Sequence, residues 1–207
     1  MKVLLINGSP RKDGNTFVAL SEIANTLEKE HIATEFFQLG SQPVRPCMAC
    51  RQCADSKRCV FDDDIANRLI EKAETAHGFV FGTPTYYGQP VGTLQSAIQR
   101  ALFAATPLFA YKPVASIVIC RRGGATAAFQ TMNMPFEMCN MPIVTSQYWN
   151  IAYGQTKGQA ALDAEGMQTM RTMARNMAWI LRHLAQEPHP DNQQESRVWT
   201  NFIRSEK

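Results

Sequence analysis

The sequence predicts one doubly wound α/β domain with five parallel strands. Short continuous apolar runs alternate with longer stretches of helical periodicity, and the chain contains no repeat or low-complexity segment. Its 207 residues are enough for one compact domain and too few for two ordinary ones. In sheets of this class ligands bind beyond the carboxyl ends of the strands. A site is therefore expected in the loops after Ile6, Gly82 and Cys120.

Five apolar segments are predicted to form the strands. The first runs from Val3 to Ile6 and is stopped by Gly-Ser-Pro, and such a short continuous run is typical of a strand buried on both faces. Because strands alternate with helices along the chain, the strands are expected to pair in parallel. The other predicted strands cover residues 33–39, 78–82, 113–120 and 143–148.

Helices are predicted between the strands. The first follows Gly14-Asn15-Thr16 and keeps helical spacing of its apolar residues. Asp62-Asp63-Asp64 are predicted to open the second, which continues to about Ala76, because acidic side chains in a first turn offset the positive end of the helix dipole. The segment 40–60, which carries prolines and four cysteines, is predicted to be a loop. The remaining helices are expected over 92–105, 125–139 and 163–185, with Pro135 breaking or kinking the second of these.

The composition excludes several classes of protein. Hydrophobic residues make up 45% of the chain and charged residues 19%, which is typical of a globular protein. Twenty-one Lys and Arg against eighteen Asp and Glu leave a net charge of +3 that is spread along the chain, so no nucleic-acid partner is expected. The apolar start is too short for a signal peptide, and no segment approaches a membrane span of roughly twenty apolar residues. We therefore expect a cytoplasmic protein with no membrane association.

The first candidate binding loop runs from Asn7 to Thr16, between a strand and a helix. It carries hydroxyls at Ser9 and Thr16, an amide at Asn15 and a guanidinium at Arg11. Unpaired N–H groups at the start of the helix complete an anion site. The loop lacks the Gly-Lys-Ser/Thr ending of a nucleoside-triphosphate loop and the Gly-x-Gly-x-x-Gly dinucleotide motif, so a single phosphate monoester fits best. The alternative is a polar turn that only caps the helix.

Two further candidate loops follow predicted strands. In the second, aromatic rings and backbone groups suit a flat, partly polar ring system. In the third, adjacent glycines let the backbone approach a ligand closely, and a guanidinium favours negative charge on a reduced ring. Taken alone, the tyrosines also fit rim residues that pack on a neighbour, and the third loop fits an ordinary basic strand end. The second loop contains Pro84, Thr85, Tyr86, Tyr87 and Gly88, and the third contains Arg121, Gly123 and Gly124.

Together, Ser-Pro-Arg-x-x-Gly-Asn-Thr, Pro-x-Tyr-Tyr-Gly and the Gly-Gly loop resemble motifs of the flavodoxin-like NAD(P)H-dependent FMN reductases, over about residues 1–185. The resemblance implies the strand order 2-1-3-4-5. It also implies that the isoalloxazine ring lies against residues 84–88 and 123–124. One departure is Gln89-Pro90-Val91-Gly92, where relatives often carry a serine, so hydrogen bonding to that side of the ring differs. The FMN phosphate is implied to lie on Ser9, Arg11, Asn15 and Thr16.

Four cysteines with the spacing Cys-x2-Cys-x2-Cys-x5-Cys lie within thirteen residues. The close gaps let successive sulfurs converge on one centre, and they fit a [4Fe–4S] cluster better than zinc. On this scaffold the loop resembles the compact cysteine motif of the iron–sulfur flavoproteins. Very similar loops occur in family members that resemble flavin reductases and are not known to hold a cluster, so structural or redox-active thiols are the alternative. The resemblance implies cluster ligands at Cys47, Cys50, Cys53 and Cys59, while Cys120 and Cys139 are predicted to be packing residues.

The predicted function is an FMN-dependent oxidoreductase that takes hydride from NAD(P)H and passes electrons to a small acceptor. A quinone, a nitro or azo compound, a flavin or a similar molecule would serve as that acceptor. Because the cofactor carries the chemistry, no catalytic side chain is predicted. The runner-up is an iron–sulfur flavoprotein electron carrier reduced by ferredoxin, and a third class is a sensor without turnover.

The expected domain covers residues 1–187, with the cysteine loop inserted at 40–60 and a tail over 188–207. The tail ends with Trp199, Phe202 and Ile203, which either dock as an arm on a partner subunit or cover their own domain. A homodimer or homotetramer is expected, because in many proteins of the resembling family two protomers close over the flavin.

Overall fold

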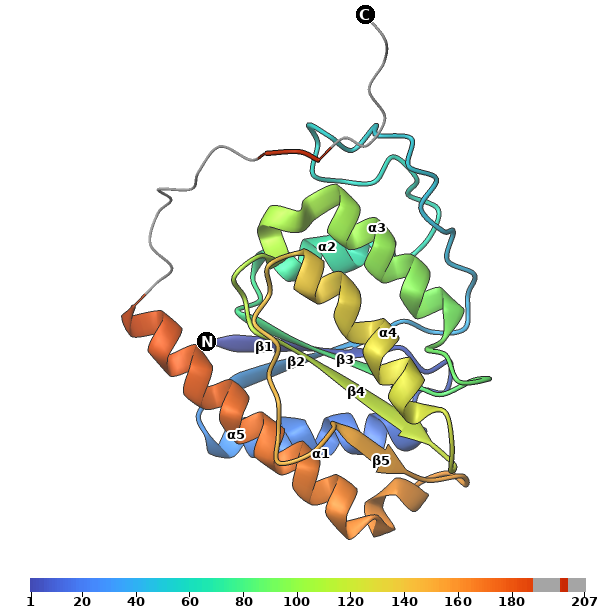
Figure 1. Cartoon of the computed structure of the whole chain (residues 1–207), viewed down its shortest axis with the longest axis vertical. Helices are drawn as coiled ribbons and strands as arrows, with labels where there is room; N and C mark the ends of the chain where they lie inside the picture. The colour runs from blue at the N-terminus through green and yellow to red at the C-terminus, as the bar shows by residue number, and fades with distance from the viewer. Residues whose placement is uncertain (188–197, 201–207) are drawn as a thin grey trace, which may run out of the picture.

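The computed structural model describes residues 1–187 and 198–200. These residues form a five-stranded sheet of order β2-β1-β3-β4-β5 in which every neighbouring pair is parallel (Figure 1). This arrangement confirms the predicted doubly wound α/β class and the flavodoxin-like strand order. The strands are β1 (Lys2–Asn7), β2 (Ala33–Gln38), β3 (Gly78–Pro84), β4 (Val114–Cys120) and β5 (Ile151–Tyr153).

Helices cover both faces of the sheet (Figure 1). On one face lie α1 (Asn15–Lys29) and α5 (Ala164–Gln186), preceded by the short 3-10 helix η1 (Gln159–Leu162). On the other face lie α2 (Ala66–Glu74), α3 (Gly92–Phe109) and α4 (Ala125–Met138). None of the helices in the described part of the chain is long and apolar enough to cross a membrane.

The alternation of side chains along β1 divides the core between these two layers. Val3 and Leu5 pack with residues of α1 and α5, while Leu4 and Ile6 pack with residues of α2, α3 and α4. Successive side chains of a strand point to opposite faces, so a continuous apolar run is what a strand needs when both of its faces are buried. Because all neighbouring strands are parallel, their carboxyl ends meet along one edge of the sheet, where the loops that follow them are free to form a site.

The predicted helix start at Asp62-Asp63-Asp64 is wrong, because α2 begins at Ala66. The three aspartates precede the helix and form ion pairs with Arg58, Arg45 and Arg100 respectively. Asp64 also accepts a hydrogen bond from the Ala66 N–H over 3.0 Å, so it still satisfies a donor at the start of the helix. Two of the three ion pairs are with arginines 18 and 36 residues away, which the local sequence does not reveal.

The predicted last strand, residues 143–148, is also wrong. Ile143 forms only an isolated bridge with Val114, and the fifth strand is Ile151–Tyr153. Residues 145–149 leave the sheet edge and return to it, since the Val118 N–H donates to the Asn150 carbonyl over 3.0 Å. The intervening segment is held by side chains instead, including the Gln147 amide that donates to Thr169 Oγ1 on α5 over 3.0 Å.

Proline acts differently in α3 and α4. In α3, Ala105 leaves helical geometry (φ −139°, ψ 34°) two residues before Pro107, and the helix then resumes to Phe109. The helix was predicted to end near this point. In α4, the helix continues through Pro135 to Met138 rather than breaking. Phe136 in that last turn is buried and its ring centroid lies 4.8 Å from that of Phe81, so packing against β3 holds the turn in place.

Candidate functional site

A pocket of about 170 Å³ opens at the carboxyl edge of the sheet. Loops that follow β1, β3, β4 and β5 contribute to it, as expected for a parallel α/β sheet. It brings together eight of the residues predicted to bind a cofactor: Ser9, Arg11, Asn15, Thr16, Pro84, Thr85, Tyr86 and Arg121. The other predicted residues, Tyr87, Gly88, Gly123 and Gly124, are not among those that line the pocket.

The loop after β1 is fixed by hydrogen bonds between its backbone and polar side chains of β1 and β2. The Ser9 N–H donates to Asn7 Oδ1 over 3.1 Å, and the Gln38 amide donates to the Ser9 carbonyl over 2.7 Å. The Ser9 hydroxyl accepts from the Arg11 N–H over 3.1 Å, which shapes the turn toward α1. The Arg11 side chain itself is exposed at the pocket. A cation is therefore available beside a rigid backbone loop.

The amino terminus of α1 faces the same pocket. Gly14 occupies the N-cap position, and none of the described side chains caps the helix by a hydrogen bond. Helix termini leave N–H groups unsatisfied and carry partial positive charge, so this end suits an anion. Gly82 lets the start of α1 pack closely against β3, because a Cβ at Gly82 would lie 2.8 Å from the Thr16 methyl group.

Asn15 has a structural task that the sequence did not indicate. Its amide nitrogen donates to the Thr156 carbonyl over 2.9 Å, and its amide oxygen accepts from the Ala160 N–H over 3.1 Å. The side chain thus ties α1 to the loop after β5. That loop brings Gly154 and Gln155 into the pocket, and the backbone N–H of Asn15 at the start of α1 is available to an anion there.

The second and third loops touch one another at the rim. Tyr86 and Gln89 exchange backbone hydrogen bonds of 2.9 and 3.0 Å around Tyr87 and Gly88, which both have positive φ (50° and 75°). This is the geometry of a two-residue hairpin turn. Gly124 also has positive φ (85°), and a Cβ there would lie 2.8 Å from Gly88 Cα. The two loops are packed backbone to backbone, and the Tyr87 side chain projects fully into solvent.

The hydroxyl group of Thr85 is a buried polar group in the wall of this pocket. Its backbone N–H donates to the Ile119 carbonyl over 2.8 Å, which fixes the residue against β4. Its buried hydroxyl oxygen has no hydrogen-bond partner among the described residues, although the residue lines the pocket. Buried polar atoms are ordinarily satisfied by protein, ordered water or a ligand, so this hydroxyl is available to hydrogen-bond a molecule that enters the pocket.

The sequence analysis missed four lining residues of this pocket. Ile119 and Cys120 end β4, and burial raises the pKa of the Cys120 thiol. Cys120 is buried as predicted, but it also borders the pocket. Gly154 and Gln155 were missed because the fifth strand was placed too early, which put its following loop at the wrong residues. An adjoining hollow of about 390 Å³ shares Gly154, Gln155 and Arg121 with this pocket.

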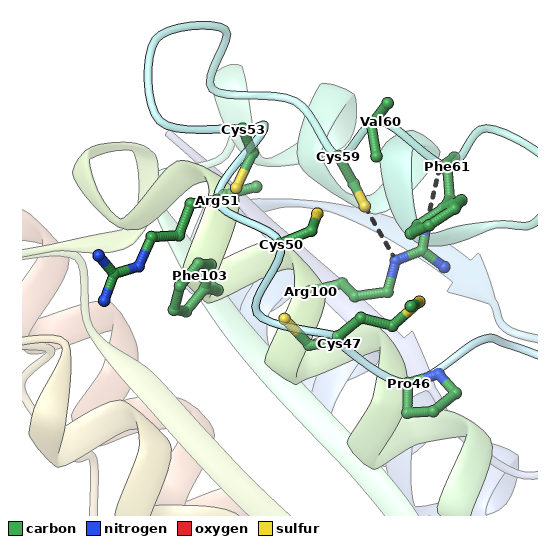
Figure 2. A pocket seen from close by; sticks show the side chains of 12 residues that line it. Pro46, Cys47, Cys50, Arg51, Cys53, Cys59, Val60, Phe61, Arg100 and Phe103 are labelled. Atoms are coloured by element: carbon green, nitrogen blue, oxygen red, sulfur yellow. Dashed lines mark hydrogen bonds between the residues drawn. The ribbon is translucent and has the colours of Figure 1, made fainter.

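A second pocket is formed by the cysteine loop against α3 (Figure 2). Cys50 is exposed, Cys47 and Cys59 are half-buried, and Cys53 is buried, which raises the pKa of its thiol. All four side chains nevertheless line this one pocket, together with Phe61, Phe103 and Arg100. In the described part of the chain, no three His, Cys, Asp or Glu side chains are gathered closely enough to hold a metal ion. Four cysteine thiols are the ligands that an iron–sulfur cluster requires, and all four line one pocket, so the residues fit a cluster in their chemistry. In this structure their sulfur atoms are not gathered around one point.

Two residues outside the cysteine loop organise the Cys59 side of this pocket, and neither was predicted from the sequence. Asn67 on α2 brackets the Cys59 backbone, accepting from its N–H and donating to its carbonyl, each over 2.9 Å. Arg100 on α3 donates from Nε to Cys59 Sγ over 3.3 Å (Figure 2). For Arg100 the signal available in the sequence was an arginine among the apolar residues of the helix predicted over 92–105, and the structure shows that it is buried.

A family model described as NADPH-dependent FMN reductase matches residues 1–156. The chain belongs to this family. It is therefore an oxidoreductase of a flavin-dependent family. Its carboxyl-edge pocket lies at the edge where parallel α/β sheets generally bind ligands.

Relatives of known name extend the comparison. The chain is 28% identical over 190 residues to an iron–sulfur flavoprotein of Methanocaldococcus jannaschii, covering 88% of this chain and 98% of that protein. It is 27% identical over 187 residues to an iron–sulfur flavoprotein of Methanosarcina thermophila, covering 87% and 95% respectively. Among solved structures, RosB with a bound riboflavin-phosphate derivative superposes with a TM-score of 0.67 at 17% identity, covering 100% of this chain and 95% of that chain.

Proposed function

We propose that this protein binds FMN at the carboxyl-edge pocket and oxidises NAD(P)H to reduce a small acceptor. In the balanced reaction, NAD(P)H, one proton and the acceptor give NAD(P)⁺ and the acceptor reduced by two electrons and two protons. The observation that carries the proposal is the pairing of an uncapped helix terminus with an unpartnered threonine hydroxyl in one pocket. FMN supplies the transfer of electrons between the two substrates when it is bound.

The loop after β1 is assigned to the FMN phosphate. The start of α1 offers backbone N–H groups, including that of Asn15, and Arg11 offers a charge-assisted donor. The Ser9 and Thr16 hydroxyls border the same space. The loop must hold an anion in a fixed position. Its backbone is fixed by the Ser9 N–H, which donates to Asn7 Oδ1, and by the Gln38 amide, which donates to the Ser9 carbonyl.

The rim loops are assigned to the isoalloxazine ring. Pro84, Thr85 and Tyr86 form one wall, and the free Thr85 hydroxyl suits a polar edge of the ring. Arg121 stands at the end of β4 and favours the added negative charge of a reduced ring. The backbone of the Tyr87-Gly88 turn and of the glycine pair Gly123-Gly124 lies at the rim of the pocket, where it borders the flat ring at close range.

Steady-state oxidation of NADPH and of NADH, with and without a simple quinone, tests this assignment. We expect turnover that requires FMN and that depends on the acceptor. No oxidation of either nucleotide by the FMN-loaded protein would contradict the enzyme assignment. The same assay with nitro and azo compounds and with free flavin identifies the class of acceptor.

The second candidate function is an electron carrier of the iron–sulfur flavoprotein type, reduced by ferredoxin. It is favoured by the four cysteines that line one pocket, and by the names of the two relatives described above. Three non-glycine residues of the loop, Ala49, Arg51 and Lys57, have positive φ (52°, 61° and 53°). Such strain costs energy and persists where a site requires it. Under this proposal Cys47, Cys50, Cys53 and Cys59 hold a [4Fe–4S] cluster.

The two candidates make different predictions for the same sample. A carrier is reduced by ferredoxin and gives no productive turnover with nicotinamide nucleotides, whereas a reductase turns over with a quinone. Rapid reduction of the flavin by ferredoxin, with no steady-state NAD(P)H oxidation, would favour the carrier.

Assembly and location belong to the same proposal. All six cysteines lie in the described part of the chain and are free thiols, which suits a reducing compartment such as the cytoplasm. We expect a homodimer or homotetramer by light scattering at micromolar concentration, and a monomer would contradict that expectation. Of the tail residues predicted to form an arm, Trp199 is largely exposed, and Phe202 and Ile203 lie outside the described residues.

A further inference from the structure

The cysteine pocket contains a buried charge. Arg100 lies in the middle of α3 and is only 1% exposed. Burying a guanidinium is costly unless its charge and its donors are satisfied. An apolar residue is the ordinary occupant of such a position, as Ala97, Ile98 and Ala101 are in the same helix. The arginine therefore calls for a local explanation.

The hydrogen bonds of this guanidinium run to the segment that carries the cysteines. Its Nε donates to Cys59 Sγ over 3.3 Å and its Nη2 donates to the Phe61 carbonyl over 2.6 Å (Figure 2). Its Nη1 forms an ion pair with Asp64 and donates to the Arg45 carbonyl over 3.4 Å. One planar group thus joins the stretch before Cys47 to the stretch after Cys59. A lysine has no such fork and cannot make these contacts together.

Asp64 completes the arrangement. It pairs with Arg100, accepts from the Arg45 N–H over 3.0 Å and accepts from the Ala66 N–H at the start of α2 over 3.0 Å. The positive charge is therefore balanced within the protein. What Arg100 gives to Cys59 is a directed N–H donor rather than an excess of charge.

We propose that Arg100 is a positioning residue that fixes Cys59 as a cluster ligand and raises the reduction potential of the cluster. The inference rests on the cluster proposed above. Reduction adds one electron to the cluster and transfers no atom, so the reduced form carries more negative charge on its sulfurs. A donor to a ligand sulfur stabilises that form, and hydrogen bonds to the sulfurs are among the determinants of cluster potentials.

The test removes the donor without changing the net charge of the site. In the double variant Arg100→Met with Asp64→Asn, one positive and one negative charge disappear together, and the amide keeps an acceptor for the Ala66 N–H. Arg58→Gln is the control for a lost charge near Cys59. Arg58 precedes Cys59 in the chain but pairs with Asp62 and Glu71 at the surface, so this variant removes a charge and leaves the donor to Cys59 in place. Each protein is assayed for iron, sulfide and FMN per chain. The cluster potential follows from an anaerobic reductive titration monitored by electron paramagnetic resonance.

We expect the double variant to keep its FMN and to shift the one-electron reduction equilibrium about tenfold toward the oxidised cluster, which is about 59 mV. Arg58→Gln is expected to keep the wild-type potential. Loss of iron from the double variant, with FMN content and thermal unfolding unchanged, supports the positioning role. A full complement of iron at the wild-type potential overturns the inference.

Two further outcomes are decisive. If the double variant does not fold, Arg100→Lys replaces it, since that substitution keeps the charge opposite Asp64 and the helix. A lowered potential or lost iron then supports the inference, and the wild-type potential overturns it. A wild-type chain that takes up no iron under anaerobic reconstitution overturns both this inference and the proposed cluster. Because that result concerns the unmodified chain, it is distinct from a failure of Arg100 alone.

Discussion

The carboxyl-edge pocket and the cysteine pocket are built by different means. At the carboxyl edge, the pocket arises from strand ends, a helix terminus and backbone contacts such as that between Gly88 and Gly124. In the cysteine loop, the pocket depends on contacts of particular side chains, chiefly Arg100 with Asp64 and Asn67 with Cys59. The first is a product of the topology, and the second is a product of specific charges and amides. We therefore expect the first to persist without its ligand and the second to depend on what it binds.

The largest expected effect separates the two pockets directly. Cys50→Ser removes the most exposed of the four thiols and is expected to abolish cluster-bound iron while FMN remains bound. Hydroxyl oxygen is a poor substitute for thiolate at an iron–sulfur cluster. Iron and FMN assays on the same anaerobic sample measure both sites. Iron retained at the wild-type level would reject the four-ligand assignment, and FMN lost with the iron would show that the pockets are not independent.

Arg11→Ala is expected to weaken FMN binding without affecting iron. Loss of a charge-assisted contact to phosphate costs on the order of 1.5–3 kcal/mol, or about ten- to a hundredfold in Kd. Fluorescence titration of the apoprotein with FMN measures it. Lys12→Ala is the control, since it removes the same charge from the neighbouring residue, which does not line the pocket. Equal losses in both variants would mean that general charge, rather than this contact, binds the phosphate.

Gly124→Ala sharpens the claim that backbone packing shapes the rim. The residue has φ of 85°, which costs a residue with a side chain about 1–2 kcal/mol. Its Cβ would also lie 2.8 Å from Gly88 Cα and push the two loops apart. We expect a lower melting temperature and weaker FMN binding. Gly123→Ala is the control, because a Cβ there meets only open space among the described residues, and an equal effect would contradict the steric explanation.

The smallest effect is expected at Glu35 on β2, away from both pockets. Hydrogen bonds from Lys2 and then Lys72, at 2.7 and 2.5 Å, hold the pKa of this carboxyl below its usual value of 4.5. Its contribution to stability is therefore present above about pH 4.5 and is lost as pH falls through the lowered pKa. Urea unfolding of Glu35→Gln at pH 7 should show a loss of about 0.2–1 kcal/mol.

A pH series checks the sign of that effect. The difference between wild type and Glu35→Gln should disappear in strong acid, where the carboxyl is protonated in the folded and unfolded states. Glu74→Gln removes the same charge from an exposed position near the end of α2 and serves as the control. A difference that persists or grows toward low pH would contradict the role assigned to the ion pairs.

These differences also explain what the sequence could and could not predict. The apolar runs and helical periodicity predicted the parallel sheet and the three loops at its carboxyl edge, because those features follow from local patterns and topology. The strand order was implied by the resemblance to the FMN reductases. The strand at 151–153 was missed because it is only three residues long, whereas the segment 143–148 offered a longer candidate, of which Ile143 forms an isolated bridge with Val114. Its misplacement also concealed Gly154 and Gln155.

The cysteine pocket could be predicted only in part. Spacing identified Cys47, Cys50, Cys53 and Cys59, and the structure places all four around one pocket. Arg100 and Asn67 lie 41 and 8 residues from Cys59, and no local pattern links them to it. The pairing of Asp64 with Arg100 likewise cannot be read from the acidic run, whose best local interpretation is a helix start.

The most direct test of the account is an anaerobic visible spectrum of the purified wild-type protein, with FMN, iron and acid-labile sulfide measured on the same sample. We predict flavin bands together with broad iron–sulfur absorbance, and about four irons per chain, as a [4Fe–4S] cluster requires. Flavin without iron, after anaerobic reconstitution, would contradict the cluster and leave a flavin reductase with four structural or redox-active thiols. A protein that takes up no FMN would contradict the central claim that the topology builds a flavin pocket.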